Sequence, residues 1–195
     1  TLGGERKYVE PAKGTANPRV FIDRLAKKMP ANVTVVADVG QNQIWTCTEY
    51  KFRKEGRLLT SGGMGTMGYS VPAAIGAKMA DNSRATVAIC GDGAFQMSFM
   101  ELATAVQFGV DIKVVVMTNN RLGMVRELQT NGYHDRQTAV FLDGSPDFIK
   151  LAEAYGIPAM RVYDDDTMEK GVEMLAEHKG ICLVEVVVDK DMPTL

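Results

Sequence analysis

Two short polar turns carry the residues whose types suit metal and phosphate chemistry. The first, Gly91-Asp92-Gly93-Ala94, follows the apolar residues 85–90, and the second, Asn119-Asn120-Arg121, follows the apolar residues 112–117. Asp92 offers a carboxylate, and amide and main-chain carbonyls offer neutral oxygens, a donor set that Mg²⁺ prefers when it shares a ligand's phosphates. Gly91 and Gly93 have no Cβ, so the backbone there can turn sharply and approach a phosphate closely.

Both turns come where a predicted strand ends, so a sheet has to position them. Strand patterns at residues 33–38, 58–60, 85–90, 112–117, 159–162 and 181–188 alternate with helical patterns. This alternation predicts an α/β fold, a doubly wound and mostly parallel sheet with helices on both faces. The carboxyl ends of neighbouring strands then lie over one crevice, where Asp92 and the asparagines are expected to converge.

The helical patterns have recognisable beginnings. Asn17 followed by Pro18 predicts a helix start, and residues 70–80, 146–155 and 167–179 are helical in pattern. Ser98 and Glu101 have capping-box spacing, which predicts that a helix begins at Ser98. The N–H groups of residues 94–97 are expected to open a helical turn towards an anion.

With these motifs in place, the chain resembles the thiamine-diphosphate-dependent enzymes. Gly-Asp-Gly at residues 91–93, followed by paired asparagines at the end of the next strand, resembles their cofactor signature. The similarity is strongest to the carboxyl-terminal, diphosphate-binding domain of the acetolactate (acetohydroxyacid) synthase large subunit. It is carried by residues 39–45, 60–69, 71–78, 92–97, 101–107 and 122–125, and it extends over roughly residues 17–188.

The resemblance implies the three-layer thiamine-diphosphate-binding fold, with thiamine diphosphate and Mg²⁺ as cofactors. It assigns the metal to the side chains of Asp92 and Asn119 and to the main-chain carbonyl of Arg121. Counting back from Leu122-Gly-Met places the family's metal-binding asparagine at position 119. Asn120 stays open as the alternative ligand, which would require a following turn that is one residue shorter.

The resemblance also implies a set of cofactor-binding residues. They are Gly40, Gln41, Asn42, Gly65, Met67, Gly91, Asp92, Gly93, Ala94, Asn119, Met124 and Val125. By this likeness Gln41 and Asn42 stand where the family contacts the diphosphate, and Asn42 replaces a usual His. Gly65 and Met67 stand where the family contacts the aminopyrimidine, with Met67 wedged beneath the cofactor.

Two other positions depart from the family pattern. Ala94 stands where many relatives have Ser, so a hydroxyl contact to phosphate is missing and only the main-chain N–H remains. Leu128 replaces a Trp that shapes the second-substrate pocket of acetohydroxyacid synthases. The second departure bears on which 2-oxo acid is accepted.

The function implied is that of the cofactor-binding domain of a 2-oxo acid decarboxylase and carboligase. Such an enzyme, a transferase or lyase of branched-chain amino acid biosynthesis, joins pyruvate to a second small 2-oxo acid and releases carbon dioxide. No catalytic residue is expected in this chain, because the family's activating glutamate lies on a pyrimidine-binding domain. We therefore expect this chain to be one part of a larger enzyme and to be inactive alone.

The family also implies partners. A pyrimidine-binding domain of the same or another chain should complete the site within a homodimer or tetramer, and residues 98–108 are the candidate contact surface. The family also allows a regulatory subunit, and FAD bound through a middle domain. Neither the middle domain nor the pyrimidine-binding domain is found in these residues.

Composition limits the remaining choices. A net charge of −2 without a basic run argues against a nucleic-acid partner, and neither a membrane-length apolar run nor a signal peptide is present in these 195 residues. A cytoplasmic protein is expected, with Cys47, Cys90 and Cys182 reduced and buried. Residues 1–16 are expected to be the remnant of a linker, and residues 17–195 to form a single domain. The polar residues 131–145 are expected to be an irregular lid loop.

Other interpretations compete with this one. The residues from Gly63 to Gly68 also match a dinucleotide fingerprint, which would make the chain the NAD-binding domain of a dehydrogenase. That reading leaves the asparagine turn without a role. Within the thiamine superfamily, a different decarboxylase, an oxidase or an acetyltransferase is possible, and a non-catalytic module that has kept the fold is a third class. The run Asp164-Asp165-Asp166 is expected to be a turn and helix cap rather than a metal cluster.

Overall fold

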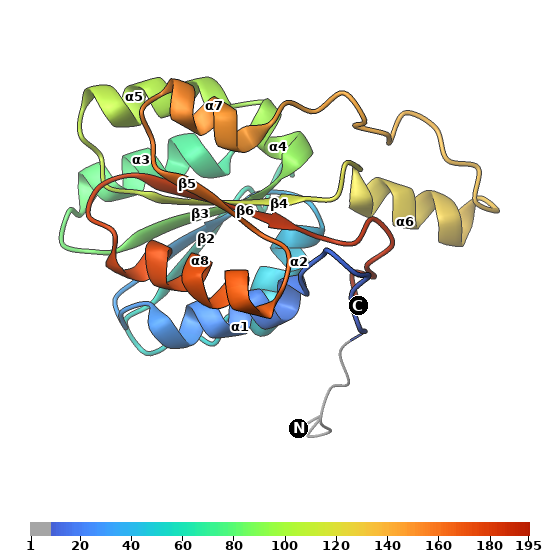
Figure 1. Ribbon diagram of the computed structural model, residues 1–195, viewed down its shortest axis with the longest axis horizontal. Helices are drawn as coiled ribbons and strands as arrows, with labels where there is room; N and C mark the ends of the chain where they lie inside the picture. The colour runs from blue at the N-terminus through green and yellow to red at the C-terminus, as the bar shows by residue number, and fades with distance from the viewer. Residues whose placement is uncertain (1–8) are drawn as a thin grey trace.

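The computed structural model describes residues 9–195. Its centre is a sheet of six parallel strands in the order β2-β1-β3-β4-β6-β5 (Figure 1). The strands are β1 (Thr34–Ala37), β2 (Arg57–Thr60), β3 (Thr86–Gly91), β4 (Lys113–Thr118), β5 (Ala159–Val162) and β6 (Cys182–Val187). All six predicted strands are present within a few residues, which confirms the α/β class and the parallel sheet.

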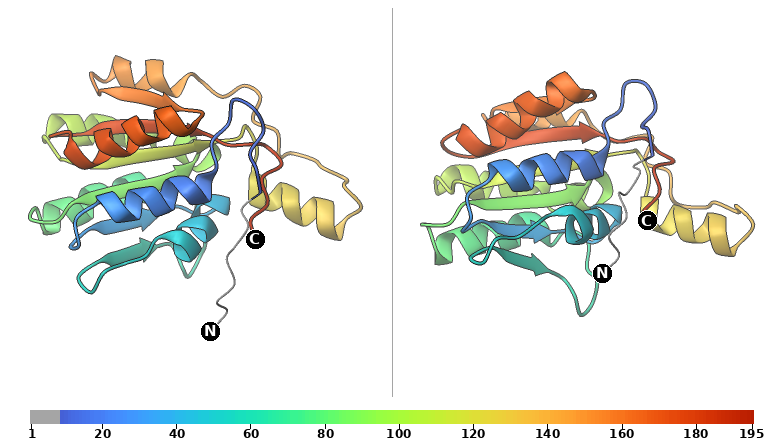
Figure 2. Two further views of the ribbon diagram at one scale, coloured as in Figure 1. Left: turned by 60° about the horizontal axis from the view of Figure 1, so that its bottom comes forward. Right: turned by 90° about the horizontal axis from the view of Figure 1, so that it is seen from below.

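Helices cover both faces of this sheet and make three layers (Figures 1 and 2). One face carries α1 (Pro18–Lys28), α2 (Gln41–Glu49) and α8 (Asp165–Glu177). The other face carries α3 (Ser70–Ala80), α4 (Asp92–Gln96), the 3₁₀ turn η1 (Phe99–Glu101), α5 (Leu102–Gln107) and α7 (Phe148–Ala154). Helix α6 (Gly123–Gly132) projects from the end of the sheet where the C-terminus also lies.

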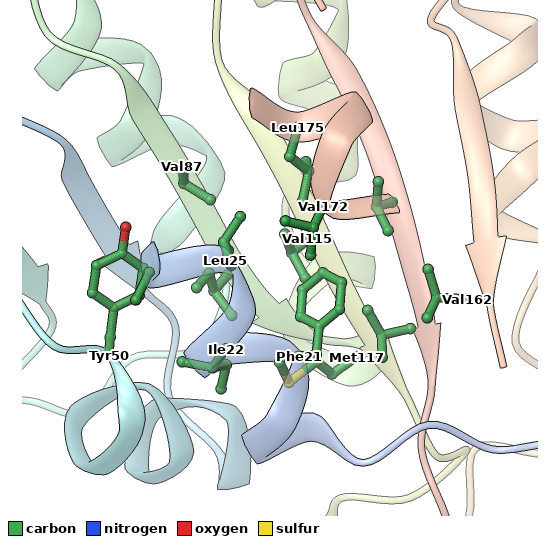
Figure 3. Close-up of a cluster of buried hydrophobic side chains, with 14 of the residues drawn as sticks. Phe21, Ile22, Leu25, Tyr50, Val87, Val115, Met117, Val162, Val172 and Leu175 are labelled. Carbon is green, nitrogen blue, oxygen red and sulfur yellow. The ribbon is translucent and has the colours of Figure 1, made fainter. Parts of the chain in front are cut away.

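The sheet is buried on both faces because its strands alternate between two apolar clusters. In β3 and β4, Val87 and Val115 pack with Phe21 of α1 on one face (Figure 3), whereas Ala88 and Val114 pack on the opposite face. This alternation follows from the two-residue period of a strand. Continuous apolar strands are the pattern expected of a parallel sheet covered on both sides.

Two helix starts are formed as predicted. The side chain of Asn17 accepts hydrogen bonds from the N–H groups of Arg19 and Val20, and Pro18 occupies the first turn of α1. Asp164 caps α8 in a reciprocal capping box with Thr167. The acidic run is therefore a helix start, and among residues 9–195 no group of three or more His, Cys, Asp or Glu side chains could hold a metal.

The predicted capping box at Ser98 is wrong. A helical turn, α4, already begins at Asp92 directly after β3, so Ser98 lies at the joint between two helical segments and its N–H donates to the carbonyl of Phe95 at 3.0 Å. Its hydroxyl makes no cap and is buried without a hydrogen-bond partner among the described residues. Glu101 accepts from the hydroxyl of Thr104 instead.

The segment expected to be a lid is partly helical. No helix was expected from the sequence at α6, which continues to Gly132, so the irregular segment starts later than residue 131. The returning chain is anchored beside the asparagine turn, because Leu122 donates to the carbonyl of Val140 at 2.9 Å and Leu142 donates to the carbonyl of Asn120 at 3.0 Å.

The remaining expectations have mixed outcomes. All three cysteines are free, and Cys90 and Cys182 are buried as predicted, but Cys47 is exposed on α2. Of the expected linker, residues 1–8 lie outside the described part, and Ala16 donates to the carbonyl of Val187 at 2.7 Å. None of the described helices combines the length and the apolar character that crossing a membrane requires.

Candidate functional site

A cleft opens at the topological switch point of the sheet. The chain leaves β1 towards α2 on one face, and it leaves the neighbouring strand β3 towards α4 on the opposite face (Figure 1). Such a divergence creates a crevice at the carboxyl ends of the strands, where α/β proteins bind ligands. The cleft has a cavity volume of about 90 Å³ and is lined by Val39, Gly40, Gln41, Asn42, Trp45, Met67, Gly91, Asp92, Gly93, Ala94, Met117, Asn119, Arg121, Leu122, Gly123, Met124 and Val125.

Asp92 lies at the tip of β3 and is only 1% exposed. Its Oδ1 accepts a hydrogen bond from the N–H of Gly93 at 2.8 Å, and its Oδ2 accepts from the N–H groups of Asn119 at 3.1 Å and Asn120 at 2.6 Å. Burial raises the pKa of this carboxyl to about 6, although the main-chain N–H groups act in the opposite direction. A cation beside the carboxylate would favour its charged form and offset this desolvation.

The two asparagines at the tip of β4 point to different surroundings. Asn119 lines the cleft; its Oδ1 accepts from the N–H of Arg121 at 3.0 Å and its Nδ2 donates to Oε1 of Gln41 at 3.2 Å. Asn120 is exposed, has a φ of 53° and does not line the cleft. This geometry favours Asn119 over the alternative Asn120 as the residue that faces a ligand.

Arg121 lines the cleft, and its guanidinium is held by two other residues. Its guanidinium pairs with Asp143 at 2.8 Å and lies over the ring of Phe141, 4.7 Å from the centroid. The side chain thus ties the asparagine turn to the segment that returns after α6. The main-chain carbonyl, which the resemblance assigns to the metal, belongs to the same turn.

The side chain of Asn42, at the start of α2, has no donor left for a phosphate. Its Nδ2 donates to the carbonyls of Asp38 at 2.8 Å and Ile89 at 3.2 Å, which accounts for both N–H bonds. Only its carbonyl oxygen remains, and an oxygen is an acceptor rather than a donor. The family's usual His is therefore replaced by a residue that braces the strand tips.

Glycines allow the walls of the cleft to approach one another. A Cβ at Gly93 would lie 2.7 Å from Cδ2 of Leu122 and 3.3 Å from Cε of Met67. A Cβ at Gly123 would lie 1.9 Å from Oε1 of Gln41. The backbone of α6 thus packs directly on the side chain from α2, which leaves no room for a larger residue.

Three helices begin at this cleft: α2, α4 and α6. The first N–H groups of a helix have no acceptor within the helix, and the helix dipole adds partial positive charge there. Their convergence suits an anionic group with several oxygens, such as a diphosphate. One buried carboxylate beside such an anion suits a bridging divalent cation.

The structure also reveals a positioning residue that was not expected from the sequence. Asp38, at the end of β1, is fully buried, and it accepts hydrogen bonds from the N–H groups of Gly68 at 3.1 Å and Ser70 at 2.7 Å. It thereby holds the segment that carries Met67 against the strand tips. Its position directly after an apolar strand, two residues before Gly40, was the available signal.

Most of the expected cofactor-binding residues come together. Of those expected, only Gly65 does not line the cleft that the described residues form, and its φ is 66°. The lining also includes Val39, Trp45, Met117, Leu122 and Gly123, which were not singled out from the sequence as site residues.

Known proteins that resemble this chain belong to one family of enzymes. Residues 38–186 match the family model described as thiamine pyrophosphate enzyme, C-terminal TPP binding domain. The chain is 39% identical over 185 residues to the mitochondrial acetolactate synthase catalytic subunit of Aspergillus candidus, covering 93% of this chain and 26% of that protein. It is 38% identical to the acetolactate synthase large subunit of Lactococcus lactis, covering 93% and 31%. It is 34% identical to the acetolactate synthase isozyme 2 large subunit of Escherichia coli, covering 94% and 33%.

These matches confirm the resemblance seen in the sequence and do not favour the dinucleotide interpretation. The chain spans about a quarter to a third of the length of the curated relatives it matches.

Proposed function

The chain belongs to the family of thiamine pyrophosphate enzyme C-terminal, cofactor-binding domains, and we propose that it is the diphosphate- and Mg²⁺-binding domain of an acetolactate-synthase-like carboligase. One observation carries this proposal. Asp92 and the Asn119 turn, from the tips of adjacent strands, are hydrogen-bonded to each other in a cleft where three helices begin.

The residues present fit the two groups. The carboxylate of Asp92, the amide oxygen of Asn119 and the carbonyl of Arg121 would hold Mg²⁺, because all are hard oxygen donors. The N-termini of α2, α4 and α6 would hold the diphosphate, with Gly91 and Gly93 allowing close approach. Met67, which lines the cleft beside Gly93, would support the cofactor from below. When bound, thiamine diphosphate supplies the carbon nucleophile and electron sink for decarboxylation of a 2-oxo acid.

The proposed reaction joins pyruvate to a second 2-oxo acid, as expected of branched-chain amino acid biosynthesis. Val125 and Leu128 on α6 are 44% and 65% exposed, so this wall of the acceptor pocket is open in the chain by itself. The second candidate function is another thiamine-dependent decarboxylase, oxidase or acetyltransferase. It is favoured by Leu128, because this residue replaces the Trp that shapes the second-substrate pocket of acetohydroxyacid synthases. For the whole enzyme, the proposal includes FAD bound through a middle domain, a regulatory subunit and a cytoplasmic location.

An apolar surface beside the cleft is the proposed contact with the rest of the enzyme. Met97, Met100, Val106 and Phe108 are 57%, 51%, 43% and 63% exposed. The surface continues to the cleft through the segment before α3, because a Cβ at Gly68 would lie 2.9 Å from Cβ of Met97. Several large apolar side chains left exposed on one short segment, residues 97–108, suit an interaction site. We assign this face to a pyrimidine-binding domain of the same or another chain, which would bring the activating glutamate.

Calorimetric titration of the chain tests the proposed function. Thiamine diphosphate should bind in the presence of Mg²⁺, much more weakly with EDTA, and not to Asp92→Ala. The chain alone should form no acetolactate from pyruvate. Equal binding by the wild type and Asp92→Ala would overturn the assignment of the site, and binding of NAD in its place would favour the dehydrogenase interpretation.

A further inference from the structure

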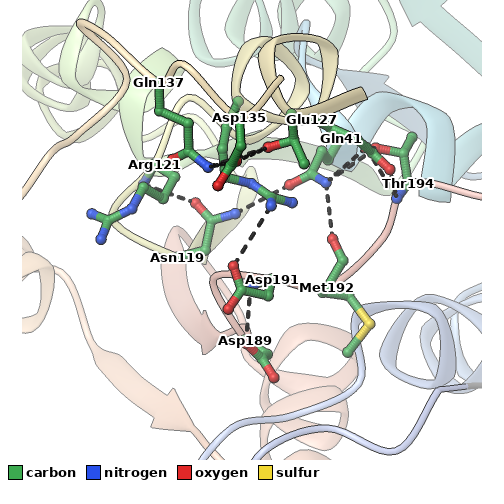
Figure 4. Close-up of polar contacts among 12 residues, drawn as sticks. Gln41, Asn119, Arg121, Glu127, Asp135, Gln137, Asp189, Asp191, Met192 and Thr194 are labelled. Carbon is green, nitrogen blue, oxygen red and sulfur yellow. Dashed lines mark hydrogen bonds and ion pairs between the residues drawn. The ribbon is translucent and has the colours of Figure 1, made fainter. Parts of the chain in front are cut away.

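Both ends of the Gln41 side chain are engaged by the protein itself (Figure 4). The residue is 4% exposed. Its Nε2 donates to the carbonyl of Met192 and to the hydroxyl of Thr194, both at 3.0 Å, and lies 3.4 Å from Oε2 of Glu127. Its Oε1 accepts from Nδ2 of Asn119 at 3.2 Å. The amide donors of Gln41 are thus used by the chain's C-terminal residues rather than directed at a phosphate.

These contacts determine which way two amides face. The carbonyl of Met192 can only accept a hydrogen bond, so Nε2 of Gln41 must face it and Oε1 must face Asn119. Asn119 must then present Nδ2 to Gln41, which leaves its Oδ1 on the other side, where the N–H of Arg121 donates to it at 3.0 Å. The orientation matters because a hard cation binds the oxygen of an amide and not its NH₂ group.

The C-terminal end of this arrangement is firmly held. Thr194 is 6% exposed, its carbonyl accepts from Nη2 of Arg19 at 2.6 Å, and its N–H donates to Oε1 of Glu127 at 3.1 Å. Nε1 of Trp45 donates to the carbonyl of Pro193 at 3.1 Å. Contacts from α1, α2 and α6 therefore keep the Met192 carbonyl in place beside Gln41.

We propose that Gln41, oriented by the C-terminal residues Met192 and Thr194, is a positioning residue that holds the Asn119 amide with its oxygen towards the cation. This inference rests on the proposed function, because it takes Asp92 and Asn119 as the side chains that hold Mg²⁺. It gives Gln41 a different task from the diphosphate contact that the family resemblance implies. The two roles make opposite predictions about Mg²⁺.

The test compares Gln41→Met with Gln43→Met in the full chain. Gln43 also lies on α2, donates to the hydroxyl of Thr60 and does not line the cleft, so it is a matched control. Thiamine diphosphate binding is measured by calorimetry across a range of Mg²⁺ concentrations. Gln41→Met should raise the Mg²⁺ concentration needed for half-maximal binding by roughly 10- to 100-fold, the usual cost of losing a residue that orients a metal ligand. Gln43→Met should leave it within about twofold of the wild type.

The shape of the Mg²⁺ dependence separates the two roles. If Gln41 acts through Asn119, saturating Mg²⁺ should restore most of the affinity for thiamine diphosphate in Gln41→Met. An equally large loss at every Mg²⁺ concentration would overturn the inference, because it would mean that Gln41 contacts the diphosphate itself. Tighter binding by Gln41→Met would also overturn it. Thermal unfolding of each cofactor-free variant verifies that the compared proteins are folded.

A second variant makes the orientation argument decisive. Asn119→Asp has two equivalent oxygens, so it needs no partner to choose between its ends. In that background Gln41→Met should not raise the Mg²⁺ requirement, because an Asp oxygen and Oε1 of Gln41 are both acceptors and have no hydrogen bond to lose. A loss as large as in the wild type would contradict the proposal. Absence of binding by the wild type would overturn the proposed function and this role together, whereas wild-type binding that is unchanged in Gln41→Met would overturn this role alone.

Discussion

Oδ2 of Asp92 accepts a hydrogen bond from the main-chain N–H of Asn120 at 2.6 Å, across 28 positions of the sequence. The bond joins the tip of β3 to the turn after β4, and the N–H of Asn119 donates to the same oxygen at 3.1 Å. The carboxylate therefore shapes the asparagine turn as well as supplying charge, so substitutions at Asp92 must separate these two contributions.

Asp92→Asn should abolish Mg²⁺-dependent binding of thiamine diphosphate while the cofactor-free protein stays folded. The variant keeps one oxygen that can accept from the turn and loses the acceptor for the N–H of Gly93, a cost that removal of the charge disfavoured by burial offsets. We expect affinity to fall by more than about 100-fold, with an unfolding free energy no more than about 1 kcal/mol below that of the wild type. Calorimetry and urea denaturation measure the two effects, and a collapse of stability in Asp92→Asn would contradict this account.

Asn119→Ala and Asn120→Gly should differ sharply in their Mg²⁺-dependent affinity for thiamine diphosphate, which calorimetry measures. Asn119 lines the cleft, so its replacement should weaken Mg²⁺-dependent binding by roughly 100-fold or more. Asn120 has a φ of 53°, a conformation that glycine adopts readily, and its side chain is exposed. Asn120→Gly should therefore bind within about threefold of the wild type. The reverse order of the two affinities would make Asn120 the metal-binding residue.

Gly123→Ala should displace the side chain of Gln41. The new Cβ would lie 1.9 Å from Oε1 of Gln41 and 3.0 Å from Nδ2 of Asn119, so either the side chain or the start of α6 has to move. We expect a loss of stability of about 1–3 kcal/mol, typical of overpacking, together with weaker Mg²⁺-dependent binding. Gly132→Ala, at the exposed end of α6 with nothing within 4 Å of its new Cβ, is the control and should be close to neutral.

Asp38→Ala should destabilise the fold more than a surface substitution would. Asp38 is fully buried and accepts from the N–H groups of Val39, Gly68 and Ser70. Leaving such donors without an acceptor costs about 1–3 kcal/mol for each that stays buried, so we expect a loss of at least about 3 kcal/mol in urea denaturation. Asp23→Ala, a change at a half-exposed position on α1 that removes only an ion pair with the exposed Lys27, should cost far less. Similar losses of unfolding free energy in the two variants would contradict the positioning role of Asp38.

The three thiols should differ in reactivity with a disulfide reagent. Burial raises the pKa of all three thiols, that of Cys90 well above its ordinary value and that of Cys182 to about 11, but only Cys47 is exposed to the reagent. At pH 8 only about one Cys182 thiol in a thousand would be ionised, and the thiolate is the reactive form. In the native chain only Cys47 should therefore react rapidly with the reagent, and all three thiols should react after denaturation. Rapid modification of Cys90 or Cys182 in the native protein would show that these strands open readily.

Local sequence patterns were enough to predict the sheet and most of the residues that meet in the cleft at its edge. Apolar strands such as residues 85–90 and 112–117, and turns such as Gly91-Asp92-Gly93, are specified by neighbouring residues, because strand burial and turn geometry depend on short-range periodicity and backbone freedom. The same motifs carried the family resemblance that the comparisons confirm. The local pattern failed at Ser98. The capping-box spacing is present there, but a helical turn, α4, already begins at Asp92, and the side chain of Ser98 caps no helix.

Only the tertiary structure decided how the donors at the site face. Gln41 meets Met192 across 151 positions and Asn119 across 78 positions of the chain, distances over which no local pattern carries information. An amide side chain has a donor at one end and an acceptor at the other, and its orientation follows from its partners rather than from its own identity. The sequence by itself therefore determined which residues gather at the strand tips, and the packing of α2, α6 and the C-terminal residues decided which atoms they present.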